Sequence, residues 1–515
     1  MADENIKDDG LNVVETTEDK TTSELDPKEV KKAENEKQRK KILIISAIVA
    51  AVILIGAIVF CCYKISSDIK AKRGEIVFFN GNNMYTDGAF SDPLHSDKVD
   101  IYSALSGYVN TDGKYLYYME DESLYYDSLN SEKENLIADH VDFFEVDKKG
   151  HIYYLSDSDL YEYTIHGSGT RNLLYNNVRM AYFDEKKERA ILVLNDGTMG
   201  TLELKSSAQF NVLDDGVTYV VDYDSKLENI IYCKGNVLDV MDKKGNKLIV
   251  ADSFSEVYPV DITKGVEVYY LDNNNYLHYC KSATSSKGVT DVANFTDITG
   301  IYCDMENMEA FLISGTVDGV TGVYLINDGK AERIEDLPST NIDYSVALDA
   351  KAKKIYFTSL PGDGGGTAKS LYSVSYGAFK KPKAVVEQNS VDSIIAIEKG
   401  KLYTLRNTDN GLALYYNNGE VVDNVLADSI IKTLDEKGYV FKYKSADGEV
   451  RVGYASKGSF KDLSSDFGDE FYAVSAKKIY MIRTTEEGAR SLGVFNGKKD
   501  KSVAEDVSAF TYIHY

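Results

Sequence analysis

The chain has 515 residues, of which 43% are apolar, and its formal net charge is −24 at pH 7. This apolar fraction excludes a globally disordered chain, and the length allows several ordinary domains or one large repeat array. The acidic charge argues against nucleic acid as a partner, because phosphate backbones are bound by basic surfaces.

Residues 1–41 form a charged segment ahead of the first apolar run. The first 30 or so are rich in Asp, Glu, Thr and Asn and poor in aromatic residues. Such a sequence buries too little apolar surface to offset the entropy lost on ordering, so we expect a disordered tail. Residues 28–41 have a helix-forming composition and extend the segment that follows.

Residues 42–63 are an uninterrupted run without charge, ILIISAIVAAVILIGAIVFCCY. As a helix the run spans about 33 Å, enough to cross a bilayer core of about 30 Å. It is long for a signal peptide and follows a long polar segment, which favours an uncleaved signal anchor. Phe60 directly before Cys61 does not fit a lipoprotein cleavage site.

Lysine and arginine residues predict the orientation of this helix. Seven lie within residues 28–41 and four within residues 64–73. The more basic flank stays in the cytoplasm, so the sequence predicts a single-pass cell-membrane protein with a cytoplasmic N-terminus. Residues 64–74 are then a linker, and the remainder is extracellular.

From residue 75 onward an aromatic-rich strand recurs at intervals of about 40 residues, the length of a four-stranded propeller blade. The 39 Tyr residues suit such strands, since aromatic side chains favour pleated surfaces. The recurring strands lie near residues 76, 115, 152, 190, 230, 267, 310, 355, 402, 439 and 479. Each is nearly continuously apolar, as a strand covered on both faces should be.

One repeat is especially clear. We expect four strands at Val141–Val146, His151–Leu155, Leu160–Ile165 and Leu173–Val178, with a turn at Asp147–Gly150. Similar turns are expected at residues 111–113, 242–245 and 435–438.

The ends of the array predict how it closes. It begins on a strand of the second type, at residues 75–79, and finishes on a strand of the first type, at residues 508–515. The last strand can therefore complete the first blade and leave no open edge. Because single propellers typically have 4 to 8 blades, about eleven units favour two tandem propellers, residues 75–290 and 291–515. One large ring is the alternative.

The repeated Tyr-Tyr strand with short Gly, Asn or Asp turns resembles the membrane-anchored, Tyr-rich β-propeller proteins of Gram-positive bacteria. That group is similar to the propeller of low-density-lipoprotein-receptor-related proteins. The resemblance implies an extracellular propeller. The chain departs from the receptor type because it contains no Trp and hence no Tyr-Trp-Thr-Asp motif.

No catalytic constellation is present in the sequence. Catalytic and ATP-binding motifs such as GxSxG, HExxH and GxxxxGK[ST] are absent, and the six His residues have no metal-ligand spacing. Cys233, Cys280 and Cys303 lie far apart, so we expect buried free thiols, with one bridge as the alternative. Residues 361–367 are Gly-rich and predict a hairpin loop, and the runs 157–159 and 272–275 predict turns.

These features predict a membrane-anchored binding or scaffold module, without a cofactor, for an extracellular protein, peptide or glycan. Two further hypotheses remain open: an extracellular propeller enzyme acting on glycan or peptide, and a transmembrane sensor. Acidic, His and Arg side chains gathered at one channel mouth would favour the enzyme.

Overall fold

The computed structural model divides the chain into two compact units, residues 1–71 and residues 72–515. It describes residues 75–515, apart from gaps at 81–82, 88–109, 112–114, 129–133, 166–168, 205–208, 261, 263–264, 284–287, 305–306, 361–367, 378–380, 465–469, 486 and 514–515. The predicted tail, membrane helix and linker lie outside the described residues. Within the described residues, no helix is both long and apolar enough to span a membrane.

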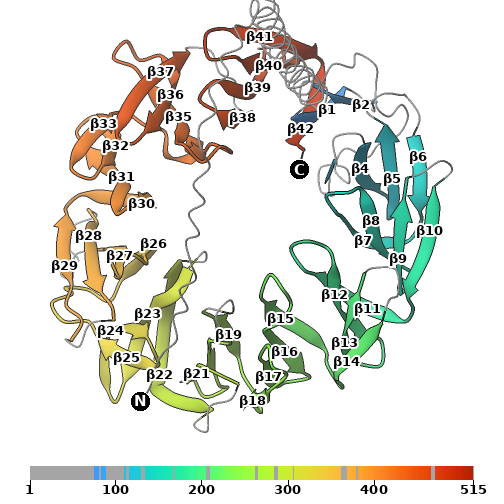
Figure 1. Cartoon of the computed structure of the whole chain (residues 1–515). Coiled ribbons are helices and arrows are strands. Elements are labelled where there is room, and N and C mark those ends of the chain that lie inside the picture. The colour runs from blue at the N-terminus through green and yellow to red at the C-terminus, as the bar shows by residue number, and fades with distance from the viewer. Residues whose placement is uncertain are drawn as a thin grey trace, which may run out of the picture. The chain divides into compact units, whose positions relative to one another are not determined.

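The described part is all-β, with one short 3-10 helix, η1 (Ala427–Ser429). Most strands belong to four-stranded antiparallel sheets whose strands follow chain order (Figure 1). The first half contains β1 (Ile76–Asn80), β2 (Asn83–Thr86), β3 (Asn110–Thr111), β4 (Tyr115–Glu120), β5 (Ser123–Ser128), β6 (Glu134–Ala138), β7 (Val141–Val146), β8 (His151–Ser156), β9 (Asp159–Thr164), β10 (Thr170–Tyr175), β11 (Val178–Phe183), β12 (Arg189–Leu194), β13 (Met199–Glu203), β14 (Phe210–Asp214), β15 (Tyr219–Tyr223), β16 (Ile230–Lys234), β17 (Val237–Met241), β18 (Lys247–Ala251), β19 (Glu256–Pro259), β20 (Val268–Leu271) and β21 (Tyr276–Cys280).

The second half is built in the same way. It contains β22 (Val289–Asp304), β23 (Asn307–Val317), β24 (Val320–Asn327), β25 (Lys330–Arg333), β26 (Ile342–Asp349), β27 (Lys354–Ser359), β28 (Ser370–Ser375), β29 (Val385–Gln388), β30 (Val391–Glu398), β31 (Lys401–Thr408), β32 (Gly411–Tyr416), β33 (Gly419–Val422), β34 (Ile431–Lys432), β35 (Tyr439–Lys444), β36 (Val450–Ser456), β37 (Ser459–Ser464), β38 (Glu470–Ser475), β39 (Lys478–Thr484), β40 (Arg490–Phe495), β41 (Asp500–Glu505) and β42 (Val507–Tyr512).

Every predicted aromatic-rich strand is confirmed, and each is the second strand of its blade. They are β1, β4, β8, β12, β16, β20, β23, β27, β31, β35 and β39. In β8 and β12 every residue after the first is buried, and all four residues of β20 are buried. The continuous apolar pattern therefore arises because neighbouring sheets cover both faces of these strands.

The repeat at residues 139–178 is confirmed in three of its four strands. The fourth strand is β10, Thr170–Tyr175, and not Leu173–Val178. Val178 begins β11, the first strand of the next sheet, and its side chain is buried. The prediction was wrong here because β10 is a largely exposed edge strand, so apolar residues do not mark its position.

Asp residues shape the turns between first and second strands. Asp147 Oδ1 accepts hydrogen bonds from the backbone N–H of Lys149 and His151, at 2.7 and 2.9 Å. Gly150 has the positive φ expected of it, +83°. At residues 435–438 the positive φ falls instead on Glu436. Gly438 is needed there for space, because a Cβ atom would lie 2.3 Å from the Ala455 carbonyl oxygen.

The last strand pairs with the first, as the ends of the array predict. In β42, Thr511 lies opposite Val77 of β1, and Phe510 lies opposite Phe78. Tyr512 opposite Ile76 extends the same antiparallel ladder. The final strand is thus the first strand of the sheet that β1 and β2 continue.

β22 runs through residue 290, where the repeat pattern predicts a domain boundary. Its N-terminal part pairs with β21, as between Leu277 and Ala293. Its C-terminal part pairs with β23, as between Ile301 and Ile313. One strand is therefore the fourth strand of one blade and the first strand of the next, which joins two blades into a seven-stranded sheet.

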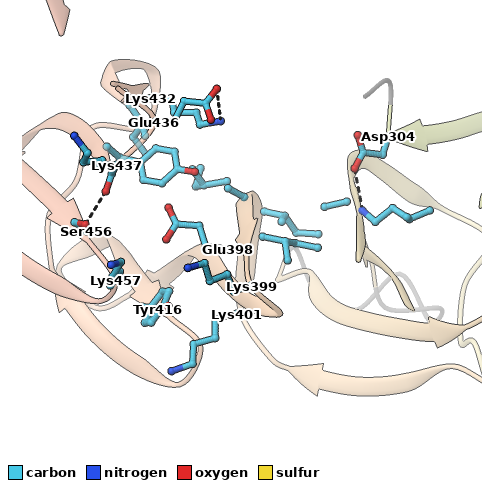
Figure 2. Close-up of a pocket in the computed structure, with 18 of the residues that line it drawn as sticks. Asp304, Glu398, Lys399, Lys401, Tyr416, Lys432, Glu436, Lys437, Ser456 and Lys457 are labelled. Atoms are coloured by element: carbon cyan, nitrogen blue, oxygen red, sulfur yellow. Dashed lines mark hydrogen bonds and ion pairs between the residues drawn. The ribbon is translucent and has the colours of Figure 1, made fainter. Parts of the chain in front are cut away.

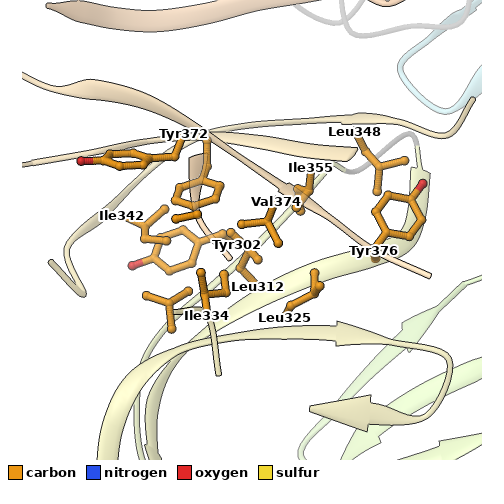
Figure 3. Packing of buried hydrophobic residues seen from close by; sticks show 14 residues of the cluster. Tyr302, Leu312, Leu325, Ile334, Ile342, Leu348, Ile355, Tyr372, Val374 and Tyr376 are labelled. Atoms are coloured by element: carbon orange, nitrogen blue, oxygen red, sulfur yellow. The ribbon is translucent and has the colours of Figure 1, made fainter. Parts of the chain in front are cut away.

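Apolar clusters pack each sheet against the next. The cluster shown in Figure 3 contains Leu312 and Leu325 from one sheet and Ile355 and Val374 from the following sheet. Other clusters join successive sheets in the same way. Two more join the β1 sheet to both of its neighbours, β4 on one side and β39 and β40 on the other. Each described sheet therefore packs against the next one through apolar side chains.

Candidate functional site

The cysteines and Asp-rich runs singled out in the sequence have structural roles. Cys233, Cys280 and Cys303 are free, and the first two are buried as predicted. Asp272 Oδ1 accepts N–H bonds from Asn274 and Tyr276 at 2.8 Å, which confirms the turn. The 157–159 run is also a turn, with positive φ at residues 157 and 158.

The remaining sequence features provide no site among the described residues. The Gly-rich loop at 361–367 lies outside them, but Ser359 and Ser370 on either side face each other across a hairpin. His278 lies between the Tyr270 and Tyr276 rings and 3.0 Å from Asp291. In the part of the chain that is described, no group of His, Cys, Asp and Glu side chains has metal-binding geometry.

A cavity of about 1480 Å³ lies among the blades that contain β26, β30 and β34 (Figure 2). We call it the lysine pocket. Five lysines and three carboxylates contribute to its lining, together with aliphatic and Tyr side chains. The charged residues are Lys399, Lys401, Lys432, Lys437, Lys457, Asp304, Glu398 and Glu436.

The strand order explains why these lysines converge. In an up-and-down sheet the first-to-second and third-to-fourth turns lie at the same end. Lys399 lies in the β30–β31 turn, Lys437 in the β34–β35 turn and Lys457 in the β36–β37 turn. Lys399 and Lys457 have φ of +52° and +49°, so they are turn residues in the left-handed region.

Aromatic side chains support the turn that carries Lys457. The Gly458 N–H donates to the Tyr403 hydroxyl at 3.0 Å, and the Tyr403 ring packs on Tyr416 with 4.7 Å between centroids. An equivalent bond runs between Gly329 N–H and the Tyr269 hydroxyl, at 2.8 Å. These bonds connect the second strand of one blade to the third-to-fourth turn of the next and hold that turn in place.

Some charges in the pocket are neutralised locally. Lys432 Nζ lies 4.0 Å from Glu436 Oε1, and Lys437 Nζ lies 3.0 Å from Asp435 Oδ2. Asp304 accepts a hydrogen bond from the Leu348 N–H at 3.0 Å. Burial raises the pKa of Glu398, although several neighbouring lysines act in the opposite direction.

The opposite wall of the pocket is aliphatic. It is formed by Val346 and Ala347 of β26 and by residues 394–397 of β30, which are half-buried. Ser345 ties the two strands together, because the Ile394 N–H donates to its hydroxyl at 2.6 Å. Lysines at one end and aliphatic side chains on the wall make the pocket amphipathic, so it can hold a ligand with both charged and apolar parts.

This site was not predicted from the sequence. A Lys-Gly pair marks each of the three turns, at residues 399–400, 437–438 and 457–458. The same pair occurs far from the pocket, at 149–150 and 244–245. The sequence signal is therefore real but unspecific, and only the packing of the blades selects these three turns.

No protein-family model matches the chain, and no curated protein matches it. Solved structures similar to it include a eukaryotic initiation factor, which is 9% identical and has a TM-score of 0.37. The alignment covers 85% of this chain and 98% of the initiation factor. The extracellular domain of BT4673, a one-component system from B. thetaiotaomicron, is 12% identical over 83% of this chain and 70% of its own, with TM-score 0.25.

PorZ, a surface component of the type-IX secretion system of Porphyromonas gingivalis, is 12% identical over 79% of this chain and 58% of its own, with TM-score 0.24. Similarity at this level carries no information about the function of this chain.

Proposed function

We propose that the protein is a single-pass, membrane-anchored β-propeller that acts outside the cell as a binding or scaffold module for a protein, peptide or glycan. The observation that carries this proposal is the lysine pocket, a large concave site formed by turns of consecutive blades. Ligand pockets typically measure about 300–1,000 Å³. The lysine pocket, at about 1480 Å³, is larger than this range and can therefore hold a correspondingly large ligand.

We further propose that the blades form one closed ring of eleven. Eleven second-type strands, the β1–β42 ladder and the apolar clusters between successive sheets support this arrangement. Closure pairs β42 with β1, so neither end of the array leaves the inner strand of a blade without a partner.

The membrane anchor in this proposal is residues 42–63. Its support is the uncharged apolar run and the surplus of basic residues on its N-terminal side. A tag at residue 1 should then resist protease added to intact cells, while the region after residue 75 remains accessible. Digestion of the tag on unbroken cells would contradict the proposed orientation.

Binding is favoured over catalysis by the residues that line the pocket. Carboxylates are present, but no His or Arg is among the described residues that line the pocket. Glu398 lies near Lys399, Lys432 and Lys457, a surrounding that matches an anion rather than a nucleophile or a second catalytic acid.

Affinity capture from intact cells tests the binding role. Cells producing the full-length chain are cross-linked and compared with cells producing the chain truncated after residue 74, which keeps the anchor. We expect a specific partner or a cell-wall component only with the full-length chain. The same set of captured molecules from both would overturn the proposal.

A further inference from the structure

The lysine pocket differs in charge from the rest of the molecule. The chain carries 82 Asp and Glu residues against 58 Lys and Arg residues, yet lysines outnumber carboxylates five to three around this cavity. Like charges repel one another, so collecting them at one place costs free energy unless a ligand offsets it. This local reversal of charge points to an anionic ligand.

Several of these lysines remain available to a ligand. Among the residues that the structure describes, no carboxylate lies within ion-pair distance of Lys399, Lys401 or Lys457. Lys401 Nζ lies 5.3 Å from the centroid of the Tyr416 ring, a cation–π contact that leaves its ammonium donors open. Lys399 and Lys457 are exposed on their turns. Three cations are therefore ready to accept negative charge.

The aliphatic wall adds a second requirement. Ile394, Ile395 and Ile397 are only half-buried, although large aliphatic side chains on a strand are normally covered. They line the same cavity as the lysines. An inorganic anion would leave this wall wet, whereas a ligand with an apolar body would cover it and gain the hydrophobic contribution.

We propose that the lysine pocket binds an amphipathic anion: a phosphate or carboxylate head group held by Lys399, Lys401 and Lys457, with an aliphatic body on the β26 and β30 wall. The proposal rests on the binding function proposed above and names the ligand class of the same site. Glu398, within the pocket, limits the affinity because its charge opposes that of the head group.

The test uses the full-length chain in nanodiscs of phosphatidylcholine, titrated with small soluble probes by calorimetry, with empty nanodiscs as the blank. Hexyl phosphate and hexanoate carry both a head group and a chain. Inorganic phosphate carries only the charge, and hexyl glucoside only the chain. We expect both amphipathic anions to bind more tightly than the other two, and the tighter of them identifies the head group.

Charge variants then locate the binding. The double variant Lys399→Glu with Lys457→Glu should weaken hexyl phosphate binding by about tenfold or more. The matched control is Lys498→Glu with Lys499→Glu, two exposed residues in the third-to-fourth turn of the following blade, which should change it little. Glu398→Gln should instead tighten binding by about threefold, a gain that misfolding cannot produce.

Three results would overturn the proposal. One is no measurable binding of either amphipathic anion, and another is equal loss in the pocket and control variants. The third is hexyl glucoside or inorganic phosphate binding as tightly as hexyl phosphate. Since capture of a partner from intact cells is measured separately, these results would leave the general binding function standing.

Discussion

At the residue scale, close packing shapes the turn beside the lysine pocket. Gly458 has φ +78°, and a Cβ atom there would lie 2.6 Å from Tyr416 Cδ1. Gly448 has φ +84°, but nothing lies within 4 Å of the position its Cβ would take. The two glycines have similar backbone conformations but different surroundings. Substituting each one therefore separates the free-energy cost of a side chain at positive φ from the cost of steric crowding.

We predict that Gly458→Ala destabilises the protein more than Gly448→Ala. Both lose about 1 kcal/mol because an L side chain disfavours positive φ. Gly458→Ala must also displace the Tyr416 ring, which adds on the order of 1–3 kcal/mol. Urea unfolding of the two variants measures the difference in the free energy of unfolding. Equal losses would show that Tyr416 does not restrain this turn.

Asp214 is a second residue whose role can be measured. Burial alone raises the pKa of its carboxyl, but hydrogen bonds from Lys234 and Tyr232, at 2.8 and 2.5 Å, outweigh burial and lower the pKa to about 2. A carboxyl with a lowered folded-state pKa stabilises the fold at pH above its unfolded value of about 3.9. That contribution is lost as the pH falls from about 4 to 2.

Asp214→Asn should therefore destabilise the protein by about 1 kcal/mol at pH 7, after allowance for solvent screening, and by little at pH 2. Guanidinium unfolding of both proteins from pH 7 to pH 2 gives this difference. A gap that stays constant with pH would mean that the carboxylate charge makes no contribution.

At the element scale, the ladder between β1 and β42 decides how the array ends. These strands are more than 400 residues apart in sequence, yet Val77 and Thr511 lie directly opposite each other. Opposed residues of antiparallel strands have Cα atoms about 4.5–5.5 Å apart, within the range of a disulfide.

The variant Val77→Cys with Thr511→Cys should form a disulfide under mild oxidation, detected by peptide mass spectrometry. The pair Val77→Cys with Ala509→Cys serves as the register control, because Ala509 lies opposite Phe79. We expect efficient cross-linking only in the first pair. Equal cross-linking in both would contradict the register of the closing ladder.

At the scale of the whole molecule, the question is whether the blades behave as one array or two. β22 crosses residue 290 and pairs on both sides, so a cut there separates hydrogen-bonded strands. The connection between β18 and β19, at residues 252–255, is mostly exposed and joins two sheets without belonging to either.

We predict that fragments 1–252 and 253–515, produced together, reassociate better than fragments 1–290 and 291–515. The first cut falls between two sheets, so the fragments share only the sheet of β42, β1 and β2. The second cut divides that sheet as well, and it also separates Tyr276, Leu277 and His278 of β21 from their partners in β22. Co-purification followed by thermal melting compares the two pairs. Two independent propellers meeting at residue 290 would give the opposite order, with each half stable alone.

Local sequence determined the positions of the second strands. HIYYL and RAILVL became β8 and β12 because a strand covered on both faces must be apolar at nearly every position. The period of about 40 residues likewise follows from the length of four short strands and their turns. The edge strand β10 was misplaced because an exposed strand has no comparable apolar requirement.

Only the tertiary structure decided how successive blades pack and where the lysine pocket lies. Every blade presents a similar interface to its neighbours, so the repeating pattern is the same for one ring and for two. Lys399, Lys437 and Lys457 belong to different turns of two consecutive blades, and the same Lys-Gly pair occurs elsewhere in the chain. Their convergence depends on how those blades pack, a long-range property that no short stretch of sequence encodes.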